Sequence, residues 1–338
     1  MNRREFLTLG ACAAAVDCLA DAVPFVDPKS VDVAAFDAAV KTLNETTLFD
    51  VEKRKDALEV VQRHIYAMQN AKPFVQMIRG GSRIPDKVVA QFHQDNPPLK
   101  WLDESFDKVL KELQETKVPV GGKPAVWYVY NMGIVVKTPK CAFSIDLCHR
   151  KAPLMAPHLD FALITHNHGD HYTDEFLGAM SRNKKPIRSN FLLDWDNYSR
   201  LEKDEKQYFD VLVKSTAADH NSHLPKAVTC FECHIGEEGA EKFVIFHSGD
   251  CCRADHLQPS VPHPDLFFGH CAIGLNFKTA YQTTMPAKLM LPVHHQELGH
   301  LGGRWRCVGF HEEPARILRE LKEIGARAAM PVWGDRVC

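Results

Sequence analysis

The sequence of 338 residues predicts an α/β protein in which a helical part precedes a β-rich part. Apolar residues recur with helical spacing between residues 28 and 116, whereas short apolar runs separated by Gly and Pro follow from residue 118 onward. Histidine usage divides the chain in the same way, because only His64 and His93 of the 18 histidines precede residue 149. We therefore expect the chemistry of the protein in its later part.

The first 22 residues are typical of an export signal. Arg3 and Arg4 precede Phe-Leu and a short Ala-rich apolar stretch, as in a twin-arginine signal peptide. Residues 20–22 read Ala-Asp-Ala, a small-x-small cleavage site that would leave a mature chain beginning at Val23. We expect a bacterial protein that is exported to the periplasm. Stable membrane insertion after cleavage is not expected, because the apolar stretch is too short to span a bilayer.

Charge and cysteine content narrow the function classes. The chain carries 41 Lys and Arg against 43 Asp and Glu, which gives no electrostatic reason to bind nucleic acid. We expect a small-molecule substrate, and homo-oligomerisation stays open. Cys12 and Cys18 fall in the signal, so nine of the 11 cysteines remain and at least one is unpaired within the chain. Most are expected to be buried thiols.

Residues 23–117 form the predicted helical arm. Gly80-Gly81-Ser82 and Asn96-Pro97-Pro98 interrupt it. We expect the arm to pack as a layer against the core, with a lid or an oligomer contact as the alternative. The apolar residues with helical spacing are Phe36, Val40 and Leu43, then Leu58, Val61, Ile65 and Met68, then Leu102, Phe106, Val109, Leu110 and Leu113.

Residues 118–338 form the expected β-rich domain. Runs rich in β-branched and aromatic residues at 126–130, 134–136 and 141–145 indicate its first strands. The short apolar run Phe-Ala-Leu-Ile at 161–164 indicates a further buried strand.

The segment Thr-His-Asn-His-Gly-Asp-His that follows this last strand is the most informative feature of the chain. A loop at the end of a buried strand is held by a rigid scaffold and still faces solvent. His166 and His168 can both turn to one metal ion, while Asp170 and His171, beyond the Gly169 turn, can serve a second. Imidazole and carboxylate together suit zinc, and also manganese or iron.

This His-x-His-x-Asp-His pattern resembles the signature of the metallo-β-lactamase superfamily. The turn at 131–133 and the strand Ile-Asp-Leu at 145–147 resemble the segments that precede the signature in that superfamily. The resemblance covers about residues 120–338 and leaves the helical arm outside. It implies a four-layered αβ/βα sandwich with a two-metal site at one edge, and further ligands in a fixed order.

The resemblance implies that the next ligand is a histidine some tens of residues further on. The run 211–213 supplies a strand, and a small residue two positions before the ligand selects Ala218 and His220. His223 is the alternative.

The last two ligands are implied in the same way. Asp250 ends the segment His-Ser-Gly-Asp, and a carboxylate can present one oxygen to each of two cations, so Asp250 is the natural bridge. The segment Leu-Pro-Val-His-His selects His294 by its Pro-x-His form, with His295 as the alternative. These two segments resemble most closely the L-ascorbate-6-phosphate lactonase branch, whose relatives include N-acylphosphatidylethanolamine phospholipase D-type enzymes.

The implied centre therefore has two divalent cations, with zinc preferred over manganese or iron. The ligands would be His166, His168 and His220 for the first, Asp170, His171 and His294 for the second, and Asp250 between them.

Several residues outside this set remain candidates for a role. His270 follows the apolar run 266–268 and is a candidate proton donor or anion-binding group. His300 and Arg304 are further anion-binding candidates. Cys251 and Cys252 follow Asp250 directly. Cys230 and Cys233 form a Cys-x-x-Cys pair, but on a strand they face opposite sides.

The residues and the resemblance together predict a metal-dependent hydrolase that acts on an ester, a lactone or a phosphodiester. Two cations about 3.5–4 Å apart would hold a hydroxide that attacks the substrate. Asp170 would orient this nucleophile, and His270 would protonate the leaving group. The alternatives are an iron-dependent redox enzyme with the same ligands and a phospholipase D-type phosphodiesterase.

Overall fold

The computed structural model describes residues 32–68, 84–192, 202–271, 275–284, 286–295 and 313–338. The expected signal peptide lies outside these residues. No described helix combines the length and apolar character needed to cross a membrane.

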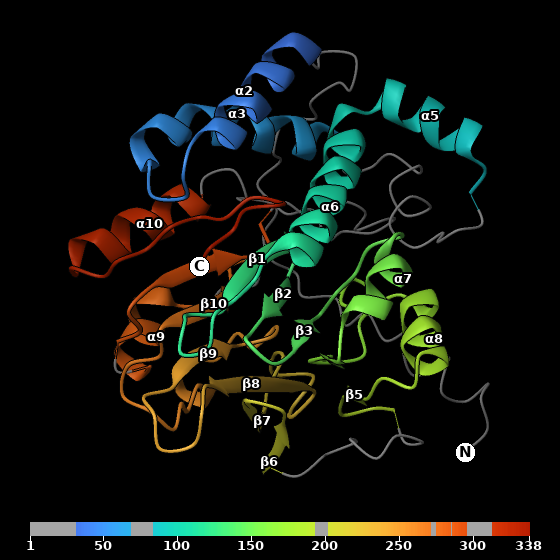
Figure 1. Cartoon of the computed structure of the whole chain (residues 1–338). Coiled ribbons are helices and arrows are strands. Elements are labelled where there is room, and N and C mark those ends of the chain that lie inside the picture. The colour runs from blue at the N-terminus through green and yellow to red at the C-terminus, as the bar shows by residue number, and fades with distance from the viewer. Residues whose placement is uncertain (1–31, 69–83, 193–201, 272–274, 285, 296–312) are drawn as a thin grey trace.

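Two mixed β-sheets form the centre of the molecule (Figure 1). Each sheet has antiparallel strands at one side and parallel strands at the other. The first has the order β1-β2-β3-β4-β5, with bounds Ala125–Tyr130, Gly133–Lys137, Ala142–Ile145, Phe161–Leu163 and Ile187–Arg188. The second has the order β11-β10-β9-β8-β7-β6; from β6 to β11 the bounds are Lys203–Tyr208, Val211–Ala218, Val228–Ile235, Phe243–His247, Leu266–His270 and Met290–Val293.

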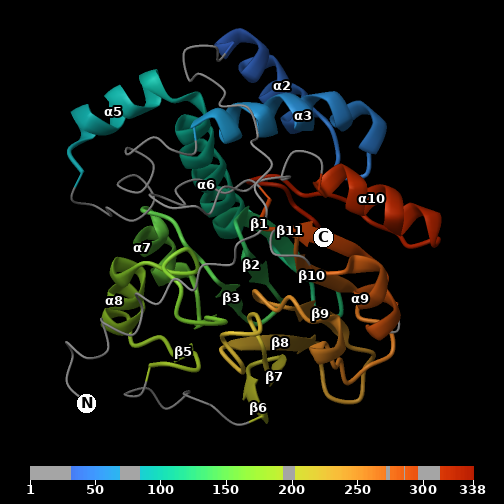
Figure 2. The ribbon, with the colours of Figure 1, turned by 180° about the vertical axis from the view of Figure 1, so that it is seen from behind.

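Helices cover the outer sides of the two sheets. Figures 1 and 2 place α7 and α8 beside the first sheet and α9 and α10 beside the second. The arm helices α2, α3, α5 and α6 lie together at one end. The bounds are α2 Val33–Glu45, α3 Val51–Met68, α5 Asp86–Asp95, α6 Pro97–Glu115, α7 Ala152–Met155, α8 Asp174–Arg182, α9 Phe277–Thr283 and α10 Glu313–Glu323; two short 3₁₀ helices span Ala156–His158 and Ala254–His256.

The apolar core confirms the expected α/β class and its layered arrangement. Val135 of the first sheet and Phe231 of the second belong to one buried cluster. A second cluster lies on the outer side of the second sheet, where Phe267 packs with Phe277 of α9 and Leu321 of α10. The order of layers is therefore helix, sheet, sheet, helix.

The arm joins the larger of these clusters. The residues expected at helical spacing lie in α2, α3 and α6, and most of those described are buried. The spacing did not indicate α5, which buries only Val89. Phe36 of α2 and Trp101 of α6 pack edge to face, and Trp101 lies against Trp333 with ring centroids 4.7 Å apart. The arm and the sheets therefore share one continuous core.

Two polar contacts fix α3 to the far end of the chain. The buried guanidinium of Arg54 bonds the Asp335 carboxylate at 2.5 Å. The Gln62 side chain donates to the backbone oxygen of His295 at 2.6 Å. Both contacts join segments more than 230 positions apart in sequence.

A buried carboxylate on α6 forms the other polar link between arm and sheets. Asp103 accepts from Arg150, and it lies 3.2 Å from Nε2 of His149 and 2.9 Å from Nε2 of His93. His149 also stacks on Phe106, with ring centroids 4.2 Å apart. Burial acts to raise the pKa of Asp103, but His149 and Arg150 outweigh it and hold that pKa well below its usual range.

We predict that Asp103→Asn lowers the free energy of unfolding by about 3 kcal/mol at neutral pH, because it leaves the partly buried guanidinium of Arg150 without its carboxylate. Asp107→Asn on the same helix removes an exposed partner of Lys151 and should cost less than about 1 kcal/mol. Urea denaturation of both variants tests this, and equal effects would contradict it.

The pH dependence of the stability follows from the direction in which the pKa of Asp103 is shifted. The folded-state pKa of Asp103 lies below the unfolded value of about 3.9. Its contribution is therefore fully present above that value and is lost as the pH falls toward the folded-state pKa. The difference in stability between wild type and Asp103→Asn should shrink in the same interval.

Candidate metal centre

The candidate ligands all lie just beyond the ends of strands. The segment 165–171 follows β4, and His220 follows β7 of the other sheet. Asp250 follows β9, and His294 follows β11. These strand ends meet at one edge of the two sheets, so residues far apart in sequence form one cluster.

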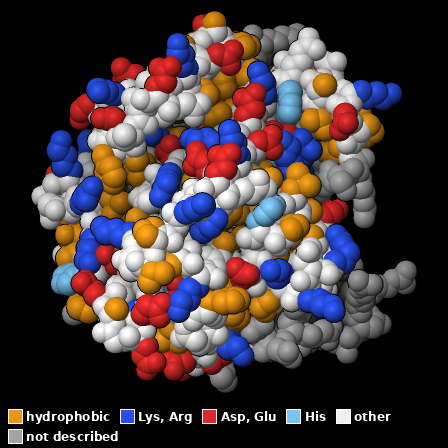
Figure 3. Space-filling model, in the orientation of Figure 1, with side chains coloured by type: hydrophobic (Ala, Val, Ile, Leu, Met, Phe, Trp, Pro, Cys, Tyr) orange, Lys and Arg blue, Asp and Glu red, His pale blue; other side chains and the backbone are white. Residues whose placement is uncertain are grey.

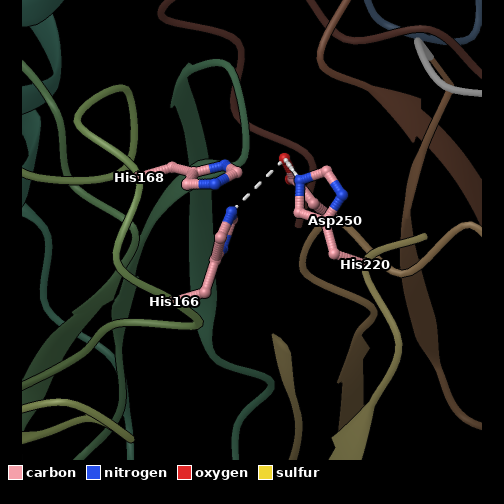
Figure 4. Close-up of side chains that lie close together, drawn as sticks. All are labelled: His166, His168, His220 and Asp250. Carbon is pink, nitrogen blue, oxygen red and sulfur yellow. Dashed lines mark ion pairs between the residues drawn. The ribbon is translucent and has the colours of Figure 1, made fainter. Parts of the chain in front are cut away.

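The first group contains His166, His168, His220 and Asp250, whose ligand atoms lie within 4.8 Å of one another. Figure 4 shows His166 and His168 on one side of the group and His220 and Asp250 on the other. Oδ2 of Asp250 is 3.6 Å from Nε2 of both His166 and His220. His223 is exposed and lies outside the group. The structure thus brings His220, and not His223, into the first group.

The second group contains Asp170, His171 and His294. Nε2 of His294 lies 3.3 Å from Oδ2 of Asp170. Nε2 of His171 lies 3.3 Å from Oδ1 of Asp250, the oxygen not used toward His166 and His220. Asp250 therefore stands between the two groups.

His295, the alternative to His294, is fully buried and lies outside both groups. Its Nε2 is 2.9 Å from the backbone oxygen of Pro331, and its ring lies near Tyr128. The two neighbouring histidines differ because His294 adopts a φ of 69°, which interrupts the extended backbone after β11.

His270 also joins the cluster, forming a third group with Asp250 and His294. Its Nε2 is 3.6 Å from Oδ2 of Asp250, and its ring centroid is 4.2 Å from that of His294. The sequence indicated His270 as a proton donor and not as a ligand. The missed signal is positional: β10 pairs in parallel with both β9 and β11, so its end lies between those of two ligand-bearing strands.

Asp146 orients the segment that carries the first four ligands. It accepts hydrogen bonds from the backbone nitrogen and hydroxyl of Thr165 at 2.8 and 2.7 Å. It also lies 2.9 Å from Nδ1 of His171. A carboxylate at Nδ1 places the proton there and leaves Nε2 as the lone-pair nitrogen.

Asn131 contacts the second group through both its backbone and its side chain. It occupies the turn between β1 and β2 with a φ of 51°, a conformation that Asn tolerates better than most residues. Its backbone oxygen accepts from the nitrogen of His294 at 3.0 Å. Its side-chain Nδ2 donates to Oδ2 of Asp170 at 3.4 Å. Asn131 thus contacts two of the three residues of this group, Asp170 through its side chain and His294 through its backbone.

Several buried polar atoms of the cluster have no hydrogen-bond partner among the described residues. Nε2 of His166, Nε2 of His171 and Oδ1 of Asp250 are buried without a hydrogen bond within the described chain. A buried polar atom without a partner costs about 1–3 kcal/mol. Cations at these atoms would remove that cost, and neutral histidine with carboxylate is a donor set for zinc, manganese or iron.

The protonation states fit the same interpretation. Burial lowers the pKa of His166 well below its usual value and that of His168 to about 4, so both are neutral at neutral pH. Burial acts to raise the pKa of Asp170 and Asp250, but His171 and other histidines hold both well below the usual range.

His171 differs in this respect from His166 and His168. Burial acts to lower its pKa, but Asp250, Asp146 and Asp170 together raise it well above its usual value. A proton on His171 balances the buried carboxylates where a cation would otherwise do so. That proton must leave when metal binds.

Two anion-binding candidates and four cysteines remain from the sequence analysis. His300 and Arg304 lie outside the described residues. Cys251 is buried beside Asp250, and Cys252 is half-buried. Cys230 and Cys233 belong to different apolar clusters, on the two faces of the second sheet, as strand alternation requires.

No protein-family profile matches the chain, and no curated protein matches it. Some solved structures resemble it at low sequence identity. Igni18, a novel metallo hydrolase from the hyperthermophilic archaeon Ignicoccus hospitalis, shares 15% identity with a TM-score of 0.48, over 63% of this chain and 97% of that one. CmlA, a diiron β-hydroxylase from Streptomyces venezuelae, shares 12% identity with a TM-score of 0.43, over 64% of this chain and 53% of that one.

A protein of the metallo-β-lactamase superfamily from Thermotoga maritima shares 12% identity with a TM-score of 0.31, over 52% of this chain and 82% of that one. At these identities and TM-scores, the likeness assigns neither a family nor a reaction to this chain.

The choice between His220 and His223 gives a direct test. We predict that His220→Ala weakens metal binding at the first group by at least about 100-fold, because it removes one of three imidazoles. His223→Ala should leave metal content unchanged. Metal per chain, measured after dialysis by elemental mass spectrometry, checks both variants. Loss of metal from His223→Ala alone would show that the wrong residue is assigned.

The hydrogen bond from the Asn131 side chain to Asp170 gives another test. Asn131→Gly keeps the left-handed backbone and the carbonyl that holds His294, but removes the donor to Asp170. We predict metal binding about 10–100-fold weaker at the second group alone, so that one of two ions is lost first on dialysis. Lys184→Gly, at an exposed residue with a φ of 54°, is the matched control. Retention of both ions by Asn131→Gly would exclude this role of the side chain.

Proposed function

We propose that this protein is a metal-dependent hydrolase with a two-cation centre. The observation that carries the proposal is the position of Asp250, whose two oxygens face different groups of histidines. When bound, two cations would polarise the substrate oxygen and lower the pKa of water to supply a nucleophile. The residues to hold them are His166, His168 and His220 in the first group, Asp170, His171 and His294 in the second, and Asp250 between.

Asp170 has a second role in this proposal. Its carboxylate stays ionised because His171 and His294 lie beside it. One of its oxygens is held by Asn131. An ionised and fixed carboxylate can accept a hydrogen bond from the attacking water and orient it toward the substrate.

We place His270 among the groups that hold the centre rather than at the leaving group. It is 1% exposed, and it lies between Asp250 and His294. A proton donor must reach the substrate, and so deeply buried a ring is better placed to hold Asp250 or to bind metal.

A small substrate with an ester, lactone or phosphodiester group suits this centre. The near balance of charge supports a small molecule over nucleic acid, and Figure 3 shows acidic and basic side chains interspersed over one face. The resemblance of the sequence segments around Asp250 and His294 favours lactonase-like or phospholipase D-type chemistry. An iron-dependent redox enzyme is the second candidate, because the same donors bind iron.

Export to the periplasm by the twin-arginine route is part of the proposal, and it rests on Arg3, Arg4 and the apolar stretch that follows. Such substrates cross the membrane already folded. A metal centre assembled before export would therefore arrive complete.

Metal analysis followed by a substrate panel tests the proposal. We expect about two ions per chain and turnover of at least one class among lactones, phosphodiesters, simple esters and β-lactams. His168→Ala and Asp250→Ala should each lower metal content and reduce turnover by at least about 1000-fold, because each removes a ligand. His158→Ala, an exposed histidine bonded to Gln114, is the control and should behave as wild type.

Two results would overturn the assignment. Full metal content and turnover in either ligand variant would exclude the two-cation centre. Oxygen consumption by the iron-loaded protein, without hydrolysis of any member of the panel, would favour the redox alternative.

A further inference from the structure

His247 is a buried histidine near the centre that belongs to none of the three groups of candidate ligands. It ends β9 and comes three positions before Asp250. The residues before it on the strand alternate between the two apolar clusters, with Ile245 in the cluster between the sheets and Phe246 in the outer one. Strand alternation therefore directs the His247 ring into the space between the two sheets.

Both ring nitrogens of His247 form hydrogen bonds with backbone atoms. The backbone nitrogen of Gly249 donates to Nδ1 at 3.2 Å, and Nε2 lies 2.8 Å from the backbone oxygen of Met132. A backbone N–H can only donate and a carbonyl oxygen can only accept, so Nδ1 carries the lone pair and Nε2 carries the proton. This neutral tautomer is the ring state that makes both bonds, and burial favours it by lowering the pKa of His247.

The two hydrogen bonds of His247 reach turns that belong to different sheets. Gly249 precedes Asp250 in the turn that follows β9 of the second sheet. Met132 lies in the turn between β1 and β2 of the first sheet, directly after Asn131. Because Asn131 contacts the second group of ligands through its side chain and its backbone, His247 connects the turn of Asp250 with the support of that group.

The turn of Asp250 needs such a contact. Gly249 has a φ of 52°, and a Cβ there would lie 2.7 Å from the Val228 side chain, so glycine suits the position. Glycine also has the widest choice of backbone conformations, and contacts must select the one that aims Asp250. The bond from the Gly249 nitrogen to Nδ1 of His247 is a contact of this kind.

We propose that His247 is a positioning residue that holds the Asp250 carboxylate in place relative to the second group of ligands. This inference rests on the two-cation function proposed above. Nδ1 fixes the turn of Gly249 and Asp250, and Nε2 ties that turn to Met132 and so to Asn131. Loss of either bond leaves every proposed ligand in the chain but loosens their relative placement. Loss of such support weakens metal binding by about 10–100-fold.

Two conservative substitutions separate the two bonds. His247→Asn can place a side-chain oxygen near the position of Nδ1, which keeps the acceptor for Gly249 and removes the donor to Met132. His247→Gln can place an amide nitrogen near the position of Nε2, which keeps the donor and removes the acceptor. His247→Phe fills the space with an apolar ring and keeps neither bond.

His234→Phe is the matched control. His234 is a buried histidine of the same sheet, and its Nε2 bonds the carboxylate of Glu232. It pairs with Val244 on β9, at the end of β8 away from the turn of Gly249. Loss of this bond should lower the midpoint of urea denaturation and leave the metal centre unchanged.

Metal affinity and cobalt spectra of the full-length protein test the inference. We expect the zinc affinity of His247→Phe, measured by competition with a chelator, to be about 10–100-fold below that of wild type. His247→Asn and His247→Gln should each lie between these two values. The visible absorption bands of the cobalt-loaded protein report ligand geometry, and they should change in His247→Phe and be partly restored in the Asn and Gln variants. His234→Phe should keep the wild-type affinity and bands.

Wild-type zinc affinity and wild-type cobalt bands in His247→Phe would overturn the inference. An equal loss of affinity in His234→Phe would also overturn it, because the effect would then follow from lost stability alone. If His247→Phe does not fold, the Asn and Gln variants decide, and wild-type affinity in both would sink the inference.

Hydrogen exchange of the metal-free protein separates this inference from the proposed function. The backbone amides of 131–133 and of 249–251 should both exchange faster in His247→Phe than in wild type, and neither should do so in His234→Phe. Unchanged exchange in either turn would contradict the link through His247. If the wild-type protein binds no metal, the proposed function fails, and the exchange result alone decides whether His247 joins the two turns.

Discussion

The buried carboxylate of Asp250 is the constraint on which the site depends. It is 4% exposed, and five imidazoles on four different segments lie within 4 Å of its oxygens. An ionised carboxylate so far from water is tolerated only where compensating charge surrounds it. The two sheets meet this requirement because the strands that carry these segments end at one edge.

Residues that are not proposed metal ligands support this arrangement. Asp146 fixes the tautomer of His171, and Asn131 holds both Asp170 and His294. Asn131, Asp146 and His294 each adopt a positive φ, so three tight backbone bends surround the centre. Such bends cost energy and persist where neighbouring contacts determine them. The geometry of this site is therefore held both by side-chain hydrogen bonds and by backbone bends.

Local patterns predicted much of this site, and contacts between strands supplied the rest. The segment 165–171 carries its own signal, because its four ligands are close in sequence. His220 and His294 were selected only through the family resemblance, which the spacing around His220 and the Pro-x-His form at His294 carry, and the structure brings both residues into the cluster. His270 joins it only because β10 lies between β9 and β11, and strand order is not visible in periodicity. The buried Asp103 network was not foreseen either, since helical spacing does not show that Asp103, inside α6, meets His149 and Arg150.

The contact between Gln62 and the backbone oxygen of His295 shows that the arm does more than cover the sheets. His295 directly follows a proposed ligand, and Arg54 on the same helix bonds Asp335. A fragment limited to residues 118–338 would keep every proposed ligand. It would also expose the apolar surface that α2, α3 and α6 now cover and leave a carboxylate and a carbonyl without their donors. We therefore expect the smallest autonomous folding unit of this protein to include the arm as well as the strands that carry the ligands.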